Sequence, residues 1–142
     1  MDSNDLERDV LLRVFSEQAD EGFAEMAEAF IALEADPGNG EVLNSIFRVC
    51  HTLNGDAASL GFPDLAESAH VLEELLACLR EGVTLPSREV VSLLLQGIDA
   101  LRELVDDALQ GREGKRPHHE ALLQELGKTA ARSRRRPARR VM

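Results

Sequence analysis

The apolar residues of this chain recur at steps of three and four, and this period constrains the fold more than any other feature. It is clearest over residues 41–60, in a stripe made of Leu43, Ile46, Phe47, Cys50, Leu53, Ala57 and Leu60. The period is that of an α-helix with one face in a protein core. The chain also has only five Phe and no Trp or Tyr, which favours helices over sheets. We therefore expect an all-α protein.

The same period predicts four long helices and a short fifth. Their expected ranges are about 4–34, 41–60, 63–82, 87–111 and 118–126, with turn residues between them. Long helices joined by short loops predict an up-down four-helix bundle with a short fifth C-terminal helix. The second and third helices are expected to be antiparallel neighbours. Outside the stripe already given, the expected core residues are Phe15, Ala19, Phe23, Met26, Phe30, Leu33, Leu65, Ala69, Leu72, Leu76, Leu79, Val91, Leu94, Ile98, Leu101, Val105, Ala108, Leu122, Leu123 and Leu126.

Charge is distributed unevenly along the 142 residues. Residues 1–111 contain 23 acidic and 6 basic side chains, a net charge of −17, whereas residues 112–142 contain 3 acidic and 10 basic, a net charge of +7. The acidic part argues against nucleic acid as the main ligand, because phosphate backbones require positive charge. The Arg-rich end is more typical of a tail than of a binding site. We predict one domain over residues 1–127 and a disordered basic tail or linker over residues 128–142.

Several kinds of protein are excluded by patterns that the sequence lacks. No run approaches the roughly 20 apolar residues of a membrane span, and no signal-peptide pattern is present, so we expect no membrane insertion. Cys50 and Cys78 lie on apolar stripes, which predicts buried thiols in a reducing compartment, the cytoplasm. A Gly-rich phosphate loop, a Cys-x-x-Cys pair and a strand pattern are all missing. We therefore expect no ATP site and no cofactor in this chain.

His51 is the most informative polar residue. It lies one position off the apolar stripe, about 100° round the helix from Cys50. Its own column contains Asn44 and Arg48 before it and the small residues Gly55 and Ala58 after it. This arrangement predicts an imidazole on the solvent side of a buried helix, presented to another protein.

The third helix carries polar residues that are expected to meet His51. His51 lies ten residues before Gly61 and His70 nine residues after it, so the two are about equally far from the turn. Glu73 shares the column of His70, as does Arg80. A carboxylate that accepts from one ring nitrogen fixes the tautomer of an imidazole and makes the other nitrogen the outward nucleophile. We expect Glu73 to have this role, with His70 as a second polar neighbour.

Two runs of residues resemble a known family. The run His51-Thr52-Leu53-Asn54-Gly55-Asp56-Ala57, followed by Leu60-Gly61-Phe62, resembles the signature of histidine phosphotransfer (Hpt) domains. The run Ala69-His70-Val71-Leu72-Glu73-Glu74-Leu75-Leu76, ending in Leu79-Arg80-Glu81-Gly82, is similar to the N-terminal phosphotransfer domain of the chemotaxis kinase CheA. The resemblance covers roughly residues 5–126.

The resemblance implies a phosphoryl carrier in a two-component chemotaxis phosphorelay. His51 would accept a phosphoryl group from a separate CheA-type kinase domain and donate it to an aspartate of a CheY- or CheB-type receiver domain. Glu73 would orient His51, and His70 would support it. ATP and Mg²⁺ would come with the partner domains, which must supply the cation clamps that phosphoryl transfer needs. The receiver is expected to dock on Asn44, Arg48, Asn54, Gly55, Asp56, Ala58 and Leu60.

Two residues depart from the family pattern. Asn54 stands where the family usually has Lys, and Asp56 where Gly or Ser is usual. Both are expected to weaken phosphoryl retention or to alter partner choice, because a phosphoryl group carries a charge near −2.

Alternatives remain open at the level of the sequence. The chain is either part of a longer CheA-type protein-histidine kinase or a stand-alone Hpt protein that shuttles phosphate between receivers. A degenerate adaptor would bind a receiver without being phosphorylated. A helical metalloprotein would use His51, His70 and Glu73 as ligands, although a fourth ligand is missing. His118 and His119 are expected to be exposed residues at the start of the fifth helix.

Overall fold

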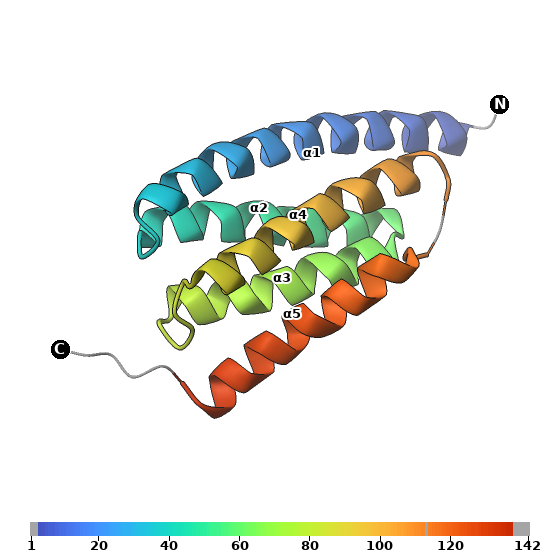
Figure 1. Ribbon diagram of the computed structural model, residues 1–142. Coiled ribbons are helices and arrows are strands. Elements are labelled where there is room, and N and C mark those ends of the chain that lie inside the picture. The colour runs from blue at the N-terminus through green and yellow to red at the C-terminus, as the bar shows by residue number, and fades with distance from the viewer. Residues whose placement is uncertain (1–2, 113, 138–142) are drawn as a thin grey trace.

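The computed structural model describes residues 3–112 and 114–137, and this part of the chain is helical with no strand (Figure 1). The elements are α1 (Ser3–Ala35), α2 (Gly40–Leu60), α3 (Pro63–Arg80), α4 (Arg88–Leu109) and α5 (Pro117–Arg135). The predicted all-α class is confirmed, and the four long helices lie within a few residues of their expected ranges.

The first four helices form an up-down bundle. Each packs against the next along the chain, and α4 also packs against α1, which closes the four-helix ring. Among the described residues the backbones of α2 and α4 do not come close to each other, so they are diagonal partners. Helix α5 lies against α3 and α4, on the side of the bundle away from α1 (Figure 1). Helices α2 and α3 therefore form one hairpin whose outer surface is left uncovered by α4 and α5.

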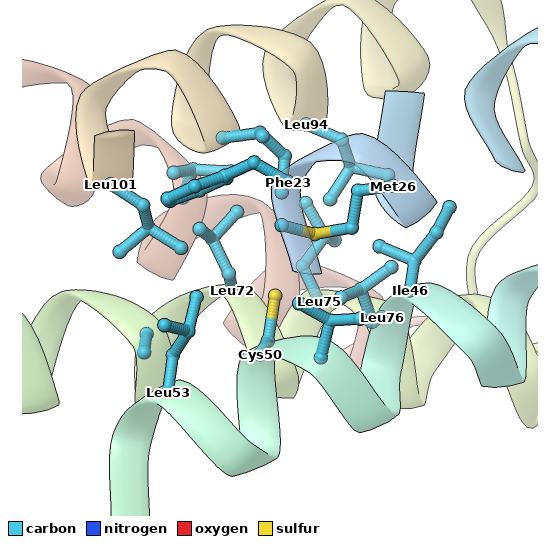
Figure 2. Packing of buried hydrophobic residues seen from close by; sticks show 14 of the residues in the cluster. Phe23, Met26, Ile46, Cys50, Leu53, Leu72, Leu75, Leu76, Leu94 and Leu101 are labelled. Atoms are coloured by element: carbon cyan, nitrogen blue, oxygen red, sulfur yellow. The ribbon is translucent and has the colours of Figure 1, made fainter. Parts of the chain in front are cut away.

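One continuous hydrophobic core joins the helices. Met26, Leu72, Leu76, Leu94 and Leu101 are essentially inaccessible, and Figure 2 shows side chains from α1, α2, α3 and α4 meeting there. The predicted stripes of α1 and α3 are buried throughout. Five residues at the edges of the other predicted stripes are only half-buried, namely Phe47, Leu60, Val91, Ala108 and Leu122.

The turn between α2 and α3 is set by local chemistry. Gly61 has φ of 80°, in the left-handed region that glycine adopts without steric cost. The backbone N–H of Phe62 donates to Ala57 O at 2.8 Å, which closes the end of α2. Pro63 then occupies the first turn of α3, where its missing N–H costs nothing. This tight connection fixes the register of α2 against α3.

The fifth helix is longer than predicted. It continues to Arg135 instead of ending near Leu126, so the expectation of a disordered segment was wrong for residues 128–135. The buried Ala130 continues the apolar face by one turn. A small alanine is a weak sequence signal, which is why the pattern ended at Leu126.

Contacts with α3 hold these last turns in place. The carbonyl of Ala130 accepts from Cys78 Sγ at 3.8 Å. Arg134 Nη1 donates to Glu81 Oε2 at 2.8 Å. The remainder of the predicted basic tail, residues 138–142 with Arg139 and Arg140, lies outside the described residues, and a domain boundary near residue 127 stays a prediction.

Candidate functional site

His51 projects from α2 and meets Glu73 of α3. The distance from His51 Nδ1 to Glu73 Oε2 is 3.4 Å. The imidazole side chain is 71% exposed, whereas the carboxylate side chain is only 10% exposed. A reachable ring is thus held from behind by a buried acid, as the sequence predicted for this pair.

Asn54 holds the other oxygen of the same carboxylate. Its Nδ2 donates to Glu73 Oε1 at 3.4 Å, so both oxygens of the buried acid have a partner. An ionised carboxylate can only accept hydrogen bonds, which places the ring proton of His51 on Nδ1. The lone pair of Nε2, on the far side of the ring, is left for chemistry at the surface.

Phe47 and Arg80 complete the surroundings of the imidazole. Phe47 lies one helical turn before His51, and the two rings are nearly parallel, at 9° and 6.1 Å between centroids. The guanidinium carbon of Arg80 lies 4.0 Å from the centre of the Phe47 ring. Sequence reasoning placed Arg80 in the column of Glu73 but gave neither Arg80 nor Phe47 a role at the site. The missed signal was the spacing of four between Phe47 and His51, which puts two rings on one helix face.

His70 does not share the contact between His51 and Glu73. Its Nε2 lies 3.3 Å from Glu74 Oε1, one turn further along α3, and both side chains are more than half exposed. The supporting role of His70 and the metal-binding alternative both required it to reach His51. The structure records a different partner for it.

The predicted docking residues fall on two sides of His51. Asn44 and Asn54 lie towards α3, where they contact Arg80 and Glu73 respectively. Arg48 and Asp56 instead line a groove between α2 and α1. Ala58 is exposed and Leu60 is half-buried beyond the site.

Gly55 is exposed, and a Cβ built on it would meet nothing within 4 Å. Packing within the protein therefore does not require glycine at this position. Glycine inside a helix costs roughly 1 kcal/mol relative to alanine. Its presence leaves the surface beside His51 free of any side chain.

Cys50, the neighbour of His51 in sequence, points the other way, into the core (Figure 2). Burial, with a smaller effect from the charge of Glu73, raises the pKa of its thiol to about 12. The reactive form of cysteine is the thiolate, so this side chain is an inert core residue. Cys78 is also a buried free thiol, as predicted.

His119 was predicted to be exposed, and this is wrong because its side chain is fully buried. The backbone N–H of Arg116 donates to its Nδ1 at 3.3 Å. The neutral ring therefore carries its proton on Nε2, which faces Glu103 Oε1 at 3.6 Å. The ring lies between the backbone of Arg116 and the Glu103 side chain of α4, and sequence periodicity does not report such tertiary contacts.

Within residues 3–112 and 114–137, Glu103, His118 and His119 form a group whose donor atoms are spaced for a metal ion, within 4.8 Å of one another. Two observations oppose such a site. The cap contact from Arg116 leaves the proton of His119 on the nitrogen that would bind the metal. The Arg116 guanidinium also donates to Glu103 Oε2 at 2.7 Å, which places a cation beside the ligands. We interpret the cluster as a structural ion-pair network.

The sequence model of the Hpt domain family matches residues 10–111 of the chain. The chain belongs to the Hpt domain family. This Hpt domain is 34% identical over 112 residues to the chemotaxis protein CheA of Borreliella burgdorferi, and 36% identical over 94 residues to CheA of Klebsiella aerogenes. These alignments cover 79% and 66% of the chain but only 13% and 14% of the relatives.

Two solved structures of CheA phosphotransfer domains have folds similar to this chain. The phosphorylated P1 domain of CheA3 from R. sphaeroides, crystallised in complex with CheY6, superposes with a TM-score of 0.78 at 25% identity. The match covers 88% of this Hpt domain and 98% of that one. The CheA phosphotransferase domain of Thermotoga maritima gives 0.65 at 28% identity, over 69% and 93% of the two chains. None of the described helices is long and apolar enough to cross a membrane.

Proposed function

We propose that the chain is the phosphoryl carrier of a chemotaxis phosphorelay and that His51 is the residue phosphorylated. The pairing of His51 with Glu73 carries this proposal. It leaves Nε2 at the surface with its lone pair available, and it gives the ring proton on Nδ1 a fixed acceptor. The family match and the likeness to a phosphorylated CheA3 domain support the same assignment.

The proposed chemistry consists of two displacements at phosphorus. In the first, the lone pair of Nε2 attacks the γ-phosphorus of ATP held by a separate CheA-type kinase domain, and the bond to the ADP oxygen breaks. In the second, an aspartate carboxylate of a receiver attacks the same phosphorus, the P–N bond breaks, and Nε2 regains its lone pair. Nδ1 keeps its proton throughout, donated towards Glu73. In the neutral tautomer with its proton on Nδ1, Nε2 carries a lone pair, so the attack needs no base on this chain.

The partners must bring the cations that stabilise the transferred group. ATP and Mg²⁺ belong to the kinase and receiver in this proposal. The receiver would be of the CheY or CheB type, consistent with the CheY6 partner of the R. sphaeroides domain. It would dock over α2 and α3, where Gly55 and Ala58 leave the surface low beside His51. The buried free thiols suit a reducing compartment, and we place the reaction in the cytoplasm.

The test is phosphoryl transfer from a CheA catalytic domain with ATP and Mg²⁺. We expect label on His51 and loss of that label to a CheY-type receiver. A His51→Gln variant should take up none, whereas His70→Gln should be labelled because His70 pairs with Glu74 instead. Undiminished label on His51→Gln would contradict the proposal. Receiver binding without any labelling of the unmodified protein would favour the adaptor.

A further inference from the structure

Arg80 is fixed across the hairpin, although it is an exposed arginine near the end of α3. Its Nη1 donates to Asn44 Oδ1 on α2 at 2.8 Å. Its guanidinium carbon lies 4.0 Å from the centre of the Phe47 ring, within the range of a cation–π contact. Two contacts with α2 therefore hold a permanent positive charge on the surface that carries His51.

Phe47 links this charge to the imidazole. The Phe47 and His51 ring centres are 6.1 Å apart. Together with the Arg80–Phe47 distance, this separation puts the guanidinium carbon of Arg80 no more than about 10 Å from the centre of the His51 ring. That distance equals about one Debye length at 0.1 M salt. A charge on His51 and the charge on Arg80 thus interact even before either side chain moves.

Most of the other charges near His51 are unfavourable for an anion. Glu73 lies behind the ring, and the chain has a net charge of −10. Arg48 lines the groove towards α1, where Glu21, Glu25 and Asp56 also lie. Asn54 is turned to Glu73. Among the described residues on the α3 side of His51, Arg80 is the cation within reach of the imidazole.

We propose that Arg80 binds the phosphoryl group on His51 and stabilises the phosphorylated state. The inference rests on the proposed function and names a further residue for it. A guanidinium offers five N–H donors in a planar fork that matches phosphate oxygens, and the contact with Asn44 uses one of them. The resting contacts with Asn44 and Phe47 keep Arg80 close to the site. On phosphorylation its free donors turn to the new oxygens.

The test uses phosphoramidate as a small phosphodonor, so that no partner protein contributes. His51 Nε2 attacks the phosphorus, the P–N bond of the donor breaks, and ammonia leaves. The fraction of phosphohistidine is measured at a fixed donor concentration for the unmodified protein, Arg80→Ala and Arg80→Lys. Arg102→Ala is the matched control, because Arg102 also lies over a phenylalanine, at 5.1 Å from the Phe23 ring, but on α4, which is diagonal to α2 in the bundle.

We expect Arg80→Ala to lower the ratio of phosphorylated to free protein by about three- to tenfold, as for loss of a partly screened charged hydrogen bond. Arg80→Lys should recover part of the loss, and Arg102→Ala should match the unmodified protein. The difference should shrink at about 0.5 M salt, which a purely structural role would not produce. Equal labelling of Arg80→Ala and the unmodified protein would overturn this inference alone. Labelling that survives in His51→Gln would overturn the proposed function as well.

Discussion

Asn54 and Glu73 form a hydrogen bond of 3.4 Å between α2 and α3, on the carboxylate oxygen opposite the one that faces His51. The buried acid is therefore held from α2 at two points, three residues apart in sequence. An amide at position 54 serves this arrangement, because it donates to the carboxylate without neutralising its charge. The departure from the lysine usual in the family thus has a structural role of its own.

Replacing Glu73 by Gln should slow phosphorylation of His51 about tenfold or more. The amide keeps the size of the side chain but loses the charge that orients the ring and favours the proton on Nδ1. Initial labelling rates with phosphoramidate would measure the effect. Glu74→Gln is the matched control, because Glu74 is exposed and pairs with His70. Equal rates for the two variants would show that Glu73 is only a structural residue.

Gly55→Ala should stabilise the fold and impair exchange with a receiver. The Cβ meets nothing within 4 Å, so the helix gains roughly 0.5–1 kcal/mol in the free energy of unfolding. The same methyl group stands where a docked partner must approach His51. Urea unfolding and the rate of phosphoryl transfer to a receiver would be compared, with phosphoramidate labelling as the check that His51 itself is intact. A more stable protein with unchanged transfer would show that the partner does not use this surface.

Acid should weaken the junction of α4 and α5 in two steps. Burial, helped by the neighbouring His118, lowers the pKa of His119 below 6.5. Between that lowered value and 6.5 the unfolded chain binds a proton that the folded protein excludes, so stability falls as pH falls below about 6.5. The hydrogen bond from Arg116 lowers the pKa of Asp107 below 3.8. The stability that Asp107 contributes is present at neutral pH and is lost as pH falls from about 3.8 through that lower value.

Urea unfolding at pH 7.5 and pH 5.5 isolates the first step. His119→Gln should reduce the difference between the two pH values, since the amide can accept the cap hydrogen bond but does not titrate. His70→Gln, at an exposed histidine, is the control. A pH difference that is the same in His119→Gln and the unmodified protein would contradict the argument.

Gly97→Ala should destabilise the bundle by about 1–3 kcal/mol, as expected for overpacking. The new Cβ would lie 2.5 Å from Leu72 Cδ2 and 3.1 Å from Leu126 Cδ1, and both leucines are fully buried, so neither can move out into solvent. Gly127→Ala is the matched control in α5, because its Cβ would meet nothing within 4 Å. Thermal unfolding should show a lower midpoint for the first variant and an equal or higher one for the second.

Much of the fold could be predicted because it depends on local periodicity. The phase difference of one residue between Cys50 and His51 was enough to place one side chain in the core and the other in solvent. The turn chemistry of Gly61 and Pro63 likewise fixed where α2 ends and α3 begins.

The remaining features depend on tertiary geometry. Counting residues from the turn gives the height of His70 and Glu73 along α3, but not which of them faces His51, because that depends on how α3 is rotated about its axis. Burial of His119 depends on how the start of α5 packs against α4, where Glu103 faces the ring. The last turns of α5 are held by partners on α3, and the sequence of α5 alone carries little sign of them.

The diagonal relationship of α2 and α4 has a practical consequence. A binding partner that covers the α2–α3 hairpin leaves the opposite flank of the bundle in contact with water. Exposed positions there, such as Asp99 and Arg102 on α4, are suitable attachment points for a fluorophore. A probe at either position would report on docking and release in real time without standing in the way of the exchange.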